Sequence, residues 1–420
     1  MLTPSSALRG ASTRVRAALA FRFLPFLKAV VALGAIGIAV APPSAVASAA
    51  ESDQGVDLKY MYYWDRNGVW NHTPALAYFR KFASVWKFQW DQEVDAVSGA
   101  SRRLGLRNIG RLADNDLKVD AITGASQQEF RHSEQATASY SNAGRNASAS
   151  LYFSDENDYR SYSPSVSGSW DFNERNTTLG GSLALFLDDM HPTGRFSGEG
   201  GSREIVSLTA SLAQVLSPLT LGSLTANVIR STGFLGHPYN PAVTADGRMF
   251  TENLPNHKTS VAISGLIIQG FHLGERLGSL RLEARHYRDD WKMISNTADL
   301  QWYQYLMDGT YVRLRARGYQ QGTAAFANEY YRGDEVYRTP DIRFYGFSSL
   351  TLGMKIGSGF PESWGESALL PDRWDLSYDH GMRNTKGELG GPGPMKHYQL
   401  FSKDESYIQG TFMVGLAFDL

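Results

Sequence analysis

The last residues of the chain, from Ile408 to Leu420, alternate without a break between two kinds of side chain. Successive side chains of a β-strand point to opposite faces, so this segment predicts a strand with one wholly apolar face. That face carries Ile408, Gly410, Phe412, Val414, Leu416, Phe418 and Leu420. Bacterial outer-membrane barrels characteristically end on such a strand, with an aromatic residue at or near the carboxyl terminus. Here that residue is Phe418.

The same period of two recurs upstream, within Ala147–Phe153, Val166–Phe172 and Val206–Leu212. The polar positions of these segments are mostly serine and threonine, as expected for a wet lumen rather than a dry core. A soluble β-sandwich also alternates, so the period alone leaves both architectures open.

Two further segments carry charge on the polar face. Apolar residues alternate there with Arg281, Glu283 and Arg285, and with Arg313, Arg315 and Arg317. Six charged groups inside a dry sandwich core would cost too much to desolvate. We therefore expect these six residues to line the lumen of a barrel, where the excess of arginine would favour anions.

Residues 1–49 have the pattern of a secretory signal peptide. A basic region without acidic residues precedes the short apolar run Ala29–Ala41, and small residues follow two prolines. The apolar run is too short to span a bilayer comfortably. The chain has no Cys, 41 Gly and 21 Tyr, and a net charge of −1 that removal of the basic leader makes more negative. This balance excludes a typical nucleic-acid-binding protein, and the absence of Cys excludes a disulfide framework.

The strand pattern predicts an all-β fold, a transmembrane antiparallel β-barrel of about 14 strands, with 12 to 16 compatible. Thirteen strands follow Arg131, Val85–Asp95 supplies another, and Asp57–Trp64 is a further candidate. We divide the chain into the leader 1–49, an N-terminal segment 50–130 with the first strand or strands, and a barrel 131–420.

The predicted connections alternate in length, as periplasmic turns and external loops do. The short links are Asn173–Thr177, Ser217–Leu221, Phe271–Gly278 and Met307–Thr310. The long links are Asp189–Ser202, Ser231–Asn256, Tyr319–Ile342 and Gly381–Ser406, the last including the strand-like run His397–Ser402. Gly357–Asp372 is an exception, a long link on the side of the short turns.

Dispersed segments of the mature chain resemble the bacterial outer-membrane family called domain of unknown function 3570. They are VDAVSGAS (Val94–Ser101), VDAITGAS (Val119–Ser126), Ser154–Phe172, Ser231–Val243, Arg285–Thr297 and Arg315–Tyr331. The resemblance implies a β-barrel without an established activity. It also implies an association with periplasmic lipoproteins, thioredoxin-like proteins and flavin transferases, and hence with extracytoplasmic redox systems.

The two octapeptides are similar to the acceptor motif of periplasmic flavin transferases: Asp, two residues, Ser or Thr, Gly-Ala and a final hydroxyl. Ser101 or Ser126 would then receive FMN through a phosphoester, with Gly-Ala leaving the backbone open for the cofactor donor. Asp followed by a hydroxyl residue and Gly is also ordinary turn chemistry, so strand-end turns are the alternative.

These observations predict a non-enzymatic outer-membrane barrel of a Gram-negative bacterium that passes or binds a small solute through a charged lumen. The alternatives are an FMN-carrying or redox-partner docking protein and a barrel hydrolase, for which no nucleophile with a His partner stands out. We expect no metal site. The expected partners are outer-membrane lipid and the barrel-assembly machinery, with a lipoprotein, thioredoxin-like protein or flavin transferase under the redox alternative.

Overall fold

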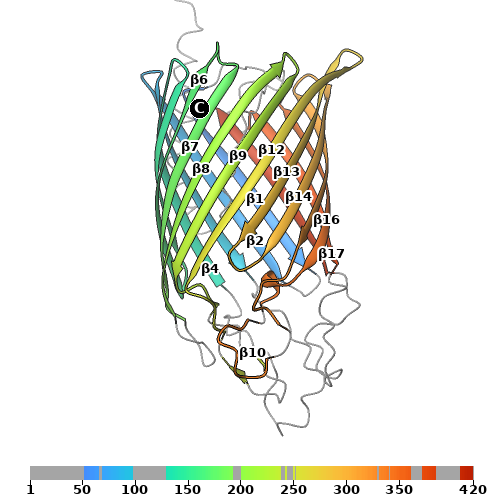
Figure 1. The fold of residues 1–420 in the computed structure, drawn as a ribbon. Helices are drawn as coiled ribbons and strands as arrows, with labels where there is room; N and C mark the ends of the chain where they lie inside the picture. The colour runs from blue at the N-terminus through green and yellow to red at the C-terminus, as the bar shows by residue number, and fades with distance from the viewer. Residues whose placement is uncertain are drawn as a thin grey trace, which may run out of the picture.

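The chain folds into one closed antiparallel β-barrel of 16 strands (Figure 1). The computed structural model describes residues 52–65, 69–97, 129–192, 200–237, 242–243, 249–250, 252–328, 331–339, 341–360, 371–384 and 407–419. Neighbours in the barrel are neighbours along the chain throughout, and β1 closes the cylinder by pairing with β18. The predicted all-β barrel is therefore confirmed.

The first barrel strands are β1 (Gln54–Asp65), β2 (Trp70–Phe82), β3 (Trp86–Val97), β4 (Glu129–Asn142), β5 (Arg145–Asp155), β6 (Tyr159–Phe172), β7 (Thr177–Met190), β8 (Gly201–Ser217) and β9 (Thr220–Gly233). The others are β12 (His257–Leu273), β13 (Arg276–Asp289), β14 (Ile294–Met307), β15 (Thr310–Gln321), β16 (Phe347–Gly359), β17 (Arg373–Asn384) and β18 (Tyr407–Asp419). Outside the barrel, β10 (Ala242–Val243) pairs with β11 (Met249–Phe250).

The two ends of the cylinder differ in their connections. One end, called the turn end here, holds the start of β1, the end of β18 and tight links such as Ala143–Gly144. Both residues of that link have positive φ, 49° and 76°, as a type I′ hairpin turn requires. The opposite end, the loop end, holds the long connections, at the bottom of Figure 1. The long link between β16 and β17 is at the turn end, the exception that the sequence predicts.

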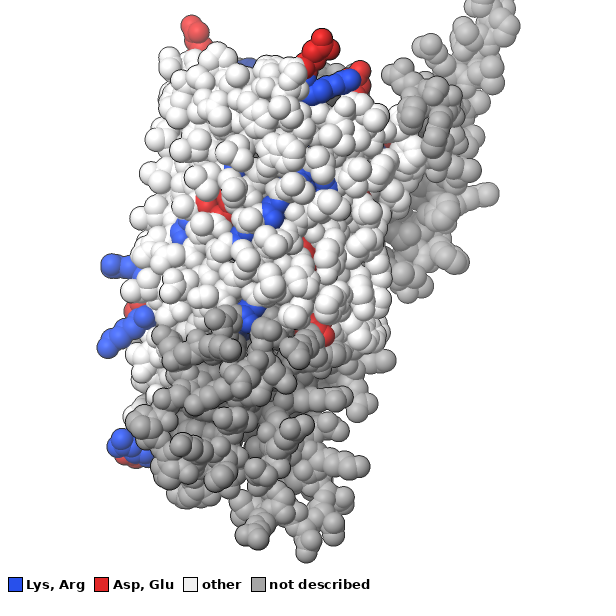
Figure 2. Space-filling model, turned by 90° about the vertical axis from the view of Figure 1, so that its right-hand side faces the viewer, with Lys and Arg blue, Asp and Glu red and all other residues white. Residues whose placement is uncertain are grey.

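The burial pattern is the reverse of that in a soluble protein. On β8, Val206 and Leu208 are 43% and 57% exposed, whereas Ser207 and Thr209, which alternate with them along the strand, are 4% and 8% exposed. Aliphatic residues on most other strands are exposed in the same way, and much of the wall facing the viewer in Figure 2 is uncharged. An apolar exterior around a polar interior is the arrangement of a membrane-spanning barrel.

The structure corrects the estimate of about 14 strands to 16. Thirteen barrel strands do lie from β4 onward, and β1 and β3 match the two N-terminal candidates. The strand that sequence analysis missed is β2, which contains Pro74. Proline lacks an N–H and argues against a central strand. The pairing of β2 with β3 skips Thr73 and Pro74, while the pairing with β1 runs through Pro74 without interruption.

The loop end carries a small folded cap. The β15–β16 connection includes the 3-10 turn Ile342–Phe344, and its apolar residues pack on the turn between β13 and β14. The buried members of this cluster are Met293, Ala324, Ala327 and Tyr345. Thr339 of the same connection is fully buried and donates its hydroxyl hydrogen to Glu252 of the β9–β12 connection. No helix in the described ranges is long and apolar enough to cross a bilayer.

Candidate functional site: the polar lumen

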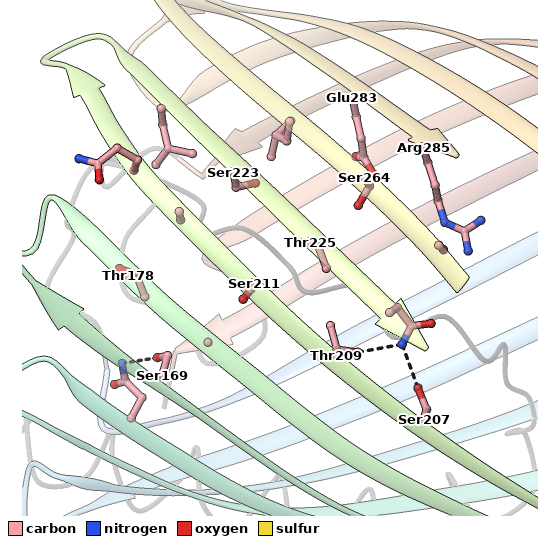
Figure 3. Close-up of a pocket in the computed structure, with 18 of the residues that line it drawn as sticks. Ser169, Thr178, Ser207, Thr209, Ser211, Ser223, Thr225, Ser264, Glu283 and Arg285 are labelled. Atoms are coloured by element: carbon pink, nitrogen blue, oxygen red, sulfur yellow. Dashed lines mark hydrogen bonds between the residues drawn. The ribbon is translucent and has the colours of Figure 1, made fainter. Parts of the chain in front are cut away.

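A cavity of about 1280 Å³ lies inside the barrel (Figure 3). Inward-facing residues of β5 to β9, β12, β13 and β15 line it, so it is part of the lumen rather than a surface groove. The lining has two chemically different parts. On β6 to β12 it is mostly neutral, with hydroxyl residues beside apolar ones such as Ile205 and Ile229 and with Asp171 as a charged member, and from β13 onward it is mostly charged.

The hydroxyl residues of the first part are called the hydroxyl wall here and are Ser169, Thr178, Ser207, Thr209, Ser211, Ser223, Thr225 and Ser264. These residues face inward because their chain neighbours, such as Leu208 and Leu224, occupy the apolar outer face. Asn227 donates hydrogen bonds to Ser207 Oγ at 3.0 Å and Thr209 Oγ1 at 2.9 Å, the dashed lines at the right of Figure 3. The wall is thus wettable, uncharged and made of small side chains.

The strand register joins part of this wall into one row. Ser169 pairs with Gly180, Gly180 with Ser211, and Ser211 with Thr225. The row continues from Thr225 to Ser264 and ends at Arg285. A Cβ at Gly180 would lie 2.7 Å from Ser211 Oγ, so the glycine leaves the room that the serine side chain occupies. Four hydroxyl residues and one glycine therefore form a row across five neighbouring strands that leads to an arginine.

The charged part is called the arginine wall here and consists of Arg281, Arg285, Arg313, Arg315 and Arg317 on β13 and β15. Arg315 forms the densest contacts. Its Nε and Nη2 donate to Asp299 Oδ2 at 2.9 and 2.5 Å, and its Nη1 lies 3.4 Å from Asp379. Arg313 also reaches Asp379, at 3.4 Å. Charge-assisted contacts of this kind hold neighbouring strands together as well as neutralising the guanidinium groups.

Gly353 explains how Asp379, two strands away, reaches these arginines. The register places Gly353 of β16 between Arg315 of β15 and Asp379 of β17. A Cβ at Gly353 would lie 1.7 Å from the Asp379 carboxylate, so only glycine lets that carboxylate cross β16.

Arg281, Glu283, Arg285 and Arg317 line the cavity. Arg281 forms an ion pair with Glu283 at 3.2 Å, and Arg285 lies over the Tyr287 ring at 5.7 Å. Among the described residues, neither Arg285 nor Arg317 forms an ion pair within 4.0 Å. Two positive charges in the cavity thus have no carboxylate in direct contact.

Acidic residues lie on the other side of the barrel. Asp91, Glu93 and Asp95 follow one another on the inner face of β3, and Thr73 donates to Asp95 at 2.8 Å. In the strand order β3 and β13 are eight strands apart in both directions. The acidic column of β3 is therefore diametrically across the lumen from Arg281 and Arg285.

Sequence analysis selected the arginines and Glu283 but missed Asp299, Asp379 and the β3 acids. The alternation of side chains could have identified these carboxylates, because each of them lies at an inward-facing position of its own strand. What the period cannot show is which strand lies next to which carboxylate.

Ser101 and Ser126 lie outside the described residues, as do the leader 1–49 and the run His397–Ser402. Val94–Val97 of the first octapeptide form the end of β3 at the loop end, and the other residues of both octapeptides lie outside the described part of the chain. Within the ranges that the structure describes, no group of three or more His, Asp or Glu could hold a metal ion.

Solved structures with similar folds are outer-membrane barrels or channels of low sequence identity. A bacterial polysaccharide outer membrane secretin is 7% identical, covers 88% of this chain and 99% of its own, and has a TM-score of 0.48. CdiB from Acinetobacter baumannii is 8% identical with a TM-score of 0.48, covering 87% of this chain and 60% of its own. The CymD monoaromatic hydrocarbon channel is 10% identical with a TM-score of 0.42, covering 88% and 89%. These values are too low to transfer a substrate to this chain.

A search of curated proteins found no match. Residues 28–409, most of the chain, match the family described as "Protein of unknown function (DUF3570)". The resemblance noted from the sequence is confirmed, and the chain belongs to the DUF3570 family.

Proposed function

We propose that this protein is a non-enzymatic outer-membrane barrel of a Gram-negative bacterium that lets small polar solutes, preferentially anions, pass through its lumen. The leader 1–49 would direct export and be removed, and the turn end would face the periplasm. A 16-stranded wall is in the size range at which barrels enclose an aqueous channel. The apolar exterior and polar interior support the membrane setting.

The observation that carries the proposal is the pair of arginines in the cavity, Arg285 and Arg317, without an ion pair in the described structure. A charge in direct contact with its partner contributes little net field. Arg285 and Arg317 have no such contact, although Arg317 lies opposite Asp299 in register, so they keep more of their field and attract counter-ions in a confined space. Arg281 contributes less because Glu283 neutralises it at 3.2 Å. An anion would meet these charges beside a wall of hydroxyl groups able to replace part of its hydration shell.

The β3 acids oppose this preference from across the lumen and shape it. A solute with separated positive and negative groups would orient between Asp91 and Glu93 on one side and Arg285 on the other. The proposed selectivity is therefore moderate, set by the difference between two opposed charged surfaces.

The test is ion selectivity in a planar bilayer under a KCl gradient. Replacing Arg285 and Arg317 together by Ser should shift the relative chloride permeability two- to fivefold towards potassium, since the two charges together contribute about 0.5–1 kcal/mol in a wet lumen. Arg145→Ser is the matched control, because Arg145 faces outward over the Trp170 ring at 4.8 Å. A wild-type barrel without conductance, or a reversal potential unchanged in the double variant, would refute the proposal.

The flavin alternative has one favourable observation, the repeated octapeptide containing Ser101 and Ser126. In the proposed orientation, the strands that flank it end on the external side. A periplasmic transferase would therefore have to act before the barrel is assembled. The mass of protein coexpressed with a flavin transferase, compared with that of Ser101→Ala and Ser126→Ala, tests this alternative and the redox partners with it.

A further inference from the structure

Two arginines near the loop end project from the outer surface of the barrel, away from the lumen. Arg230 of β9 shares the outer face with the exposed Val228, and Arg288 of β13 shares it with the exposed Leu282. Strand β12 separates them: Arg230 pairs in register with Thr259, and Arg288 pairs with Val261. Basic side chains project from the left edge of the barrel in Figure 2, below its mid-height, on the side of the loops.

Several other outward-facing charges have partners. Arg160 binds Asp155 at 2.8 Å, His132 binds Glu134 at 3.2 Å, and Arg145 lies over the Trp170 ring. In contrast, neither Arg230 nor Arg288 forms an ion pair with a described residue, since no carboxylate oxygen of these residues lies within 4.0 Å of either guanidinium group. Glu204 of β8 is on the same outer face near Arg230 but does not pair with it.

The surroundings of the two arginines are mixed: Glu204 and Thr259 lie near Arg230, and His286 lies near Arg288, but apolar residues adjoin both arginines. In register, Val206, 43% exposed, faces Arg230, and Ile294, 51% exposed, faces Arg288. Ile263 of β12, 48% exposed, continues the apolar surface towards the turn end. An arginine on the lipid face is unfavourable in hydrocarbon, and this cost decreases towards the headgroups. The two guanidinium groups therefore need an anion at the boundary between apolar surface and loops.

Phosphate is the anion that fits this position. Guanidinium groups bind phosphate oxygens through paired, charge-assisted hydrogen bonds, and phosphates occur at this depth as lipid headgroups. Two strand spacings across and two residues along place the Cα atoms of Arg230 and Arg288 roughly 12 Å apart. One large headgroup bearing two phosphates spans such a distance.

We propose that Arg230 and Arg288 form a binding site for a lipid with two phosphate groups in the leaflet at the loop end, its acyl chains lying along the apolar faces of β9, β12 and β13. The site is independent of the solute that the lumen passes. Its role is to anchor a specific lipid to this side of the wall.

The experiment is native mass spectrometry of the detergent-solubilised barrel with three added lipids: bisphosphorylated lipid A, its monophosphorylated form, and phosphatidylcholine. We expect a bound molecule of the bisphosphorylated lipid to be retained most, the monophosphorylated form several-fold less, and phosphatidylcholine not at all. The double variant R230Q/R288Q should bind the bisphosphorylated lipid at least about tenfold more weakly, because two charge-assisted contacts are lost. R145Q, which removes an outward arginine at the turn end, should bind it as the wild type does.

Equal retention of all three lipids, equal retention by R230Q/R288Q, or an equal loss in R145Q would each overturn the proposal. Displacement of the lipid by millimolar inorganic phosphate would identify a free-phosphate site instead and would also overturn it. A heat-modifiable gel shift identical to that of the wild type verifies that the variants are folded. If the double variant fails to fold, the ranking of the three lipids on the wild-type protein decides the matter.

Discussion

The hydroxyl wall and the arginine wall are built on the same outer pattern but solve the problem of a polar interior in different ways. On β8 and β9, small side chains hydrogen-bond locally, as Asn227 does with Ser207 and Thr209. On β13 to β17, long side chains form ion pairs across several strands, as Arg315 does with Asp299 and Asp379. The first solution leaves open volume, and the second fills volume and cross-links strands.

Under the proposed function, the difference separates two properties of a channel. The hydroxyl wall would contribute width and wettability, and we expect single changes at its half-buried positions to have little effect on folding. The arginine wall contributes charge and lateral stability, and its residues depend on one another. We therefore expect substitutions in the arginine wall to change stability, and substitutions in the hydroxyl wall to change conductance.

The largest effect is expected for Asp299→Ala. The Asp299 side chain is 8% exposed, and its loss leaves Arg315 with the longer contact to Asp379 as its remaining ion pair among the described residues. Removing one partner of a largely buried pair should lower the free energy of unfolding by about 2–3 kcal/mol, less than in a dry core because the lumen is wet. Urea unfolding in detergent measures this. Ser211→Ala in the hydroxyl wall is the control and should change it by less than about 0.5 kcal/mol. Equal losses in both variants would abolish the distinction between the walls.

A second prediction concerns pH and the cap at the loop end, which belongs to neither wall. Burial raises the pKa of Glu252 to about 7, despite hydrogen bonds from Thr339 Oγ1 and the His237 backbone N–H. Asp341 raises this pKa further and Arg343 lowers it. Since the folded form binds the proton more tightly than the unfolded form, the stabilisation of the cap is complete below pH 4.5, the ordinary pKa, and is lost as the pH rises through about 7.

Limited proteolysis of the β15–β16 connection should therefore be slower at pH 5 than at pH 8. The free energy of local opening should be larger at pH 5, by an amount on the order of 1–2 kcal/mol. Glu252→Gln should remove this dependence while the barrel itself stays resistant at both values. Cleavage that is independent of pH in the wild type would show that the carboxyl does not link the two connections.

The smallest effect on stability is expected for substitutions on β8, which test the inward and outward faces of the hydroxyl wall. Ser211 faces the cavity and Leu212, its neighbour on β8, is 41% exposed on the outer face. Ser211→Trp should roughly halve the single-channel conductance by occupying the lumen, whereas Leu212→Trp should leave it unchanged. Stability should change little in either case. A reduction by both substitutions, or by Leu212→Trp alone, would mean that the two faces have been assigned the wrong way round.

The alternation of side chains was sufficient to predict the strands from β4 onward, because an apolar outer face imposes a period of two that is long enough in each strand to survive local interruptions such as Pro164 of β6. It was not sufficient for β2, where Pro74 interrupts the ladder with β3 and the cross-strand bond from Thr73 to Asp95 lies beside the gap. From the sequence alone, a proline within a strand is interpreted as the end of that strand, even where the fold accommodates it.

The lumen illustrates a second limit. Alternation identified Arg313 and Arg315 as polar-face residues, but their partner Asp379 is more than sixty positions away and reaches them only because Gly353 lacks a side chain. Such a contact depends on the register of three strands at once, which a single sequence does not reveal. The predictions for Ser101 and Ser126 concern residues outside the described structure and remain predictions.

The central claim is that apolar residues of the wall face hydrocarbon while their neighbours face water inside the cylinder. The chain has no Cys, so single cysteines can be introduced without a background. Cysteines at Ala210, Ser211, Leu212 and Ala213, in barrels reconstituted into liposomes, would be treated with a charged, water-soluble maleimide. Ser211 and Ala213 line the cavity and are half-buried, so we predict that Ser211→Cys and Ala213→Cys react and that Ala210→Cys and Leu212→Cys do not. Equal reactivity at all four positions, or the opposite alternation, would contradict the structure of the wall and the proposed channel with it.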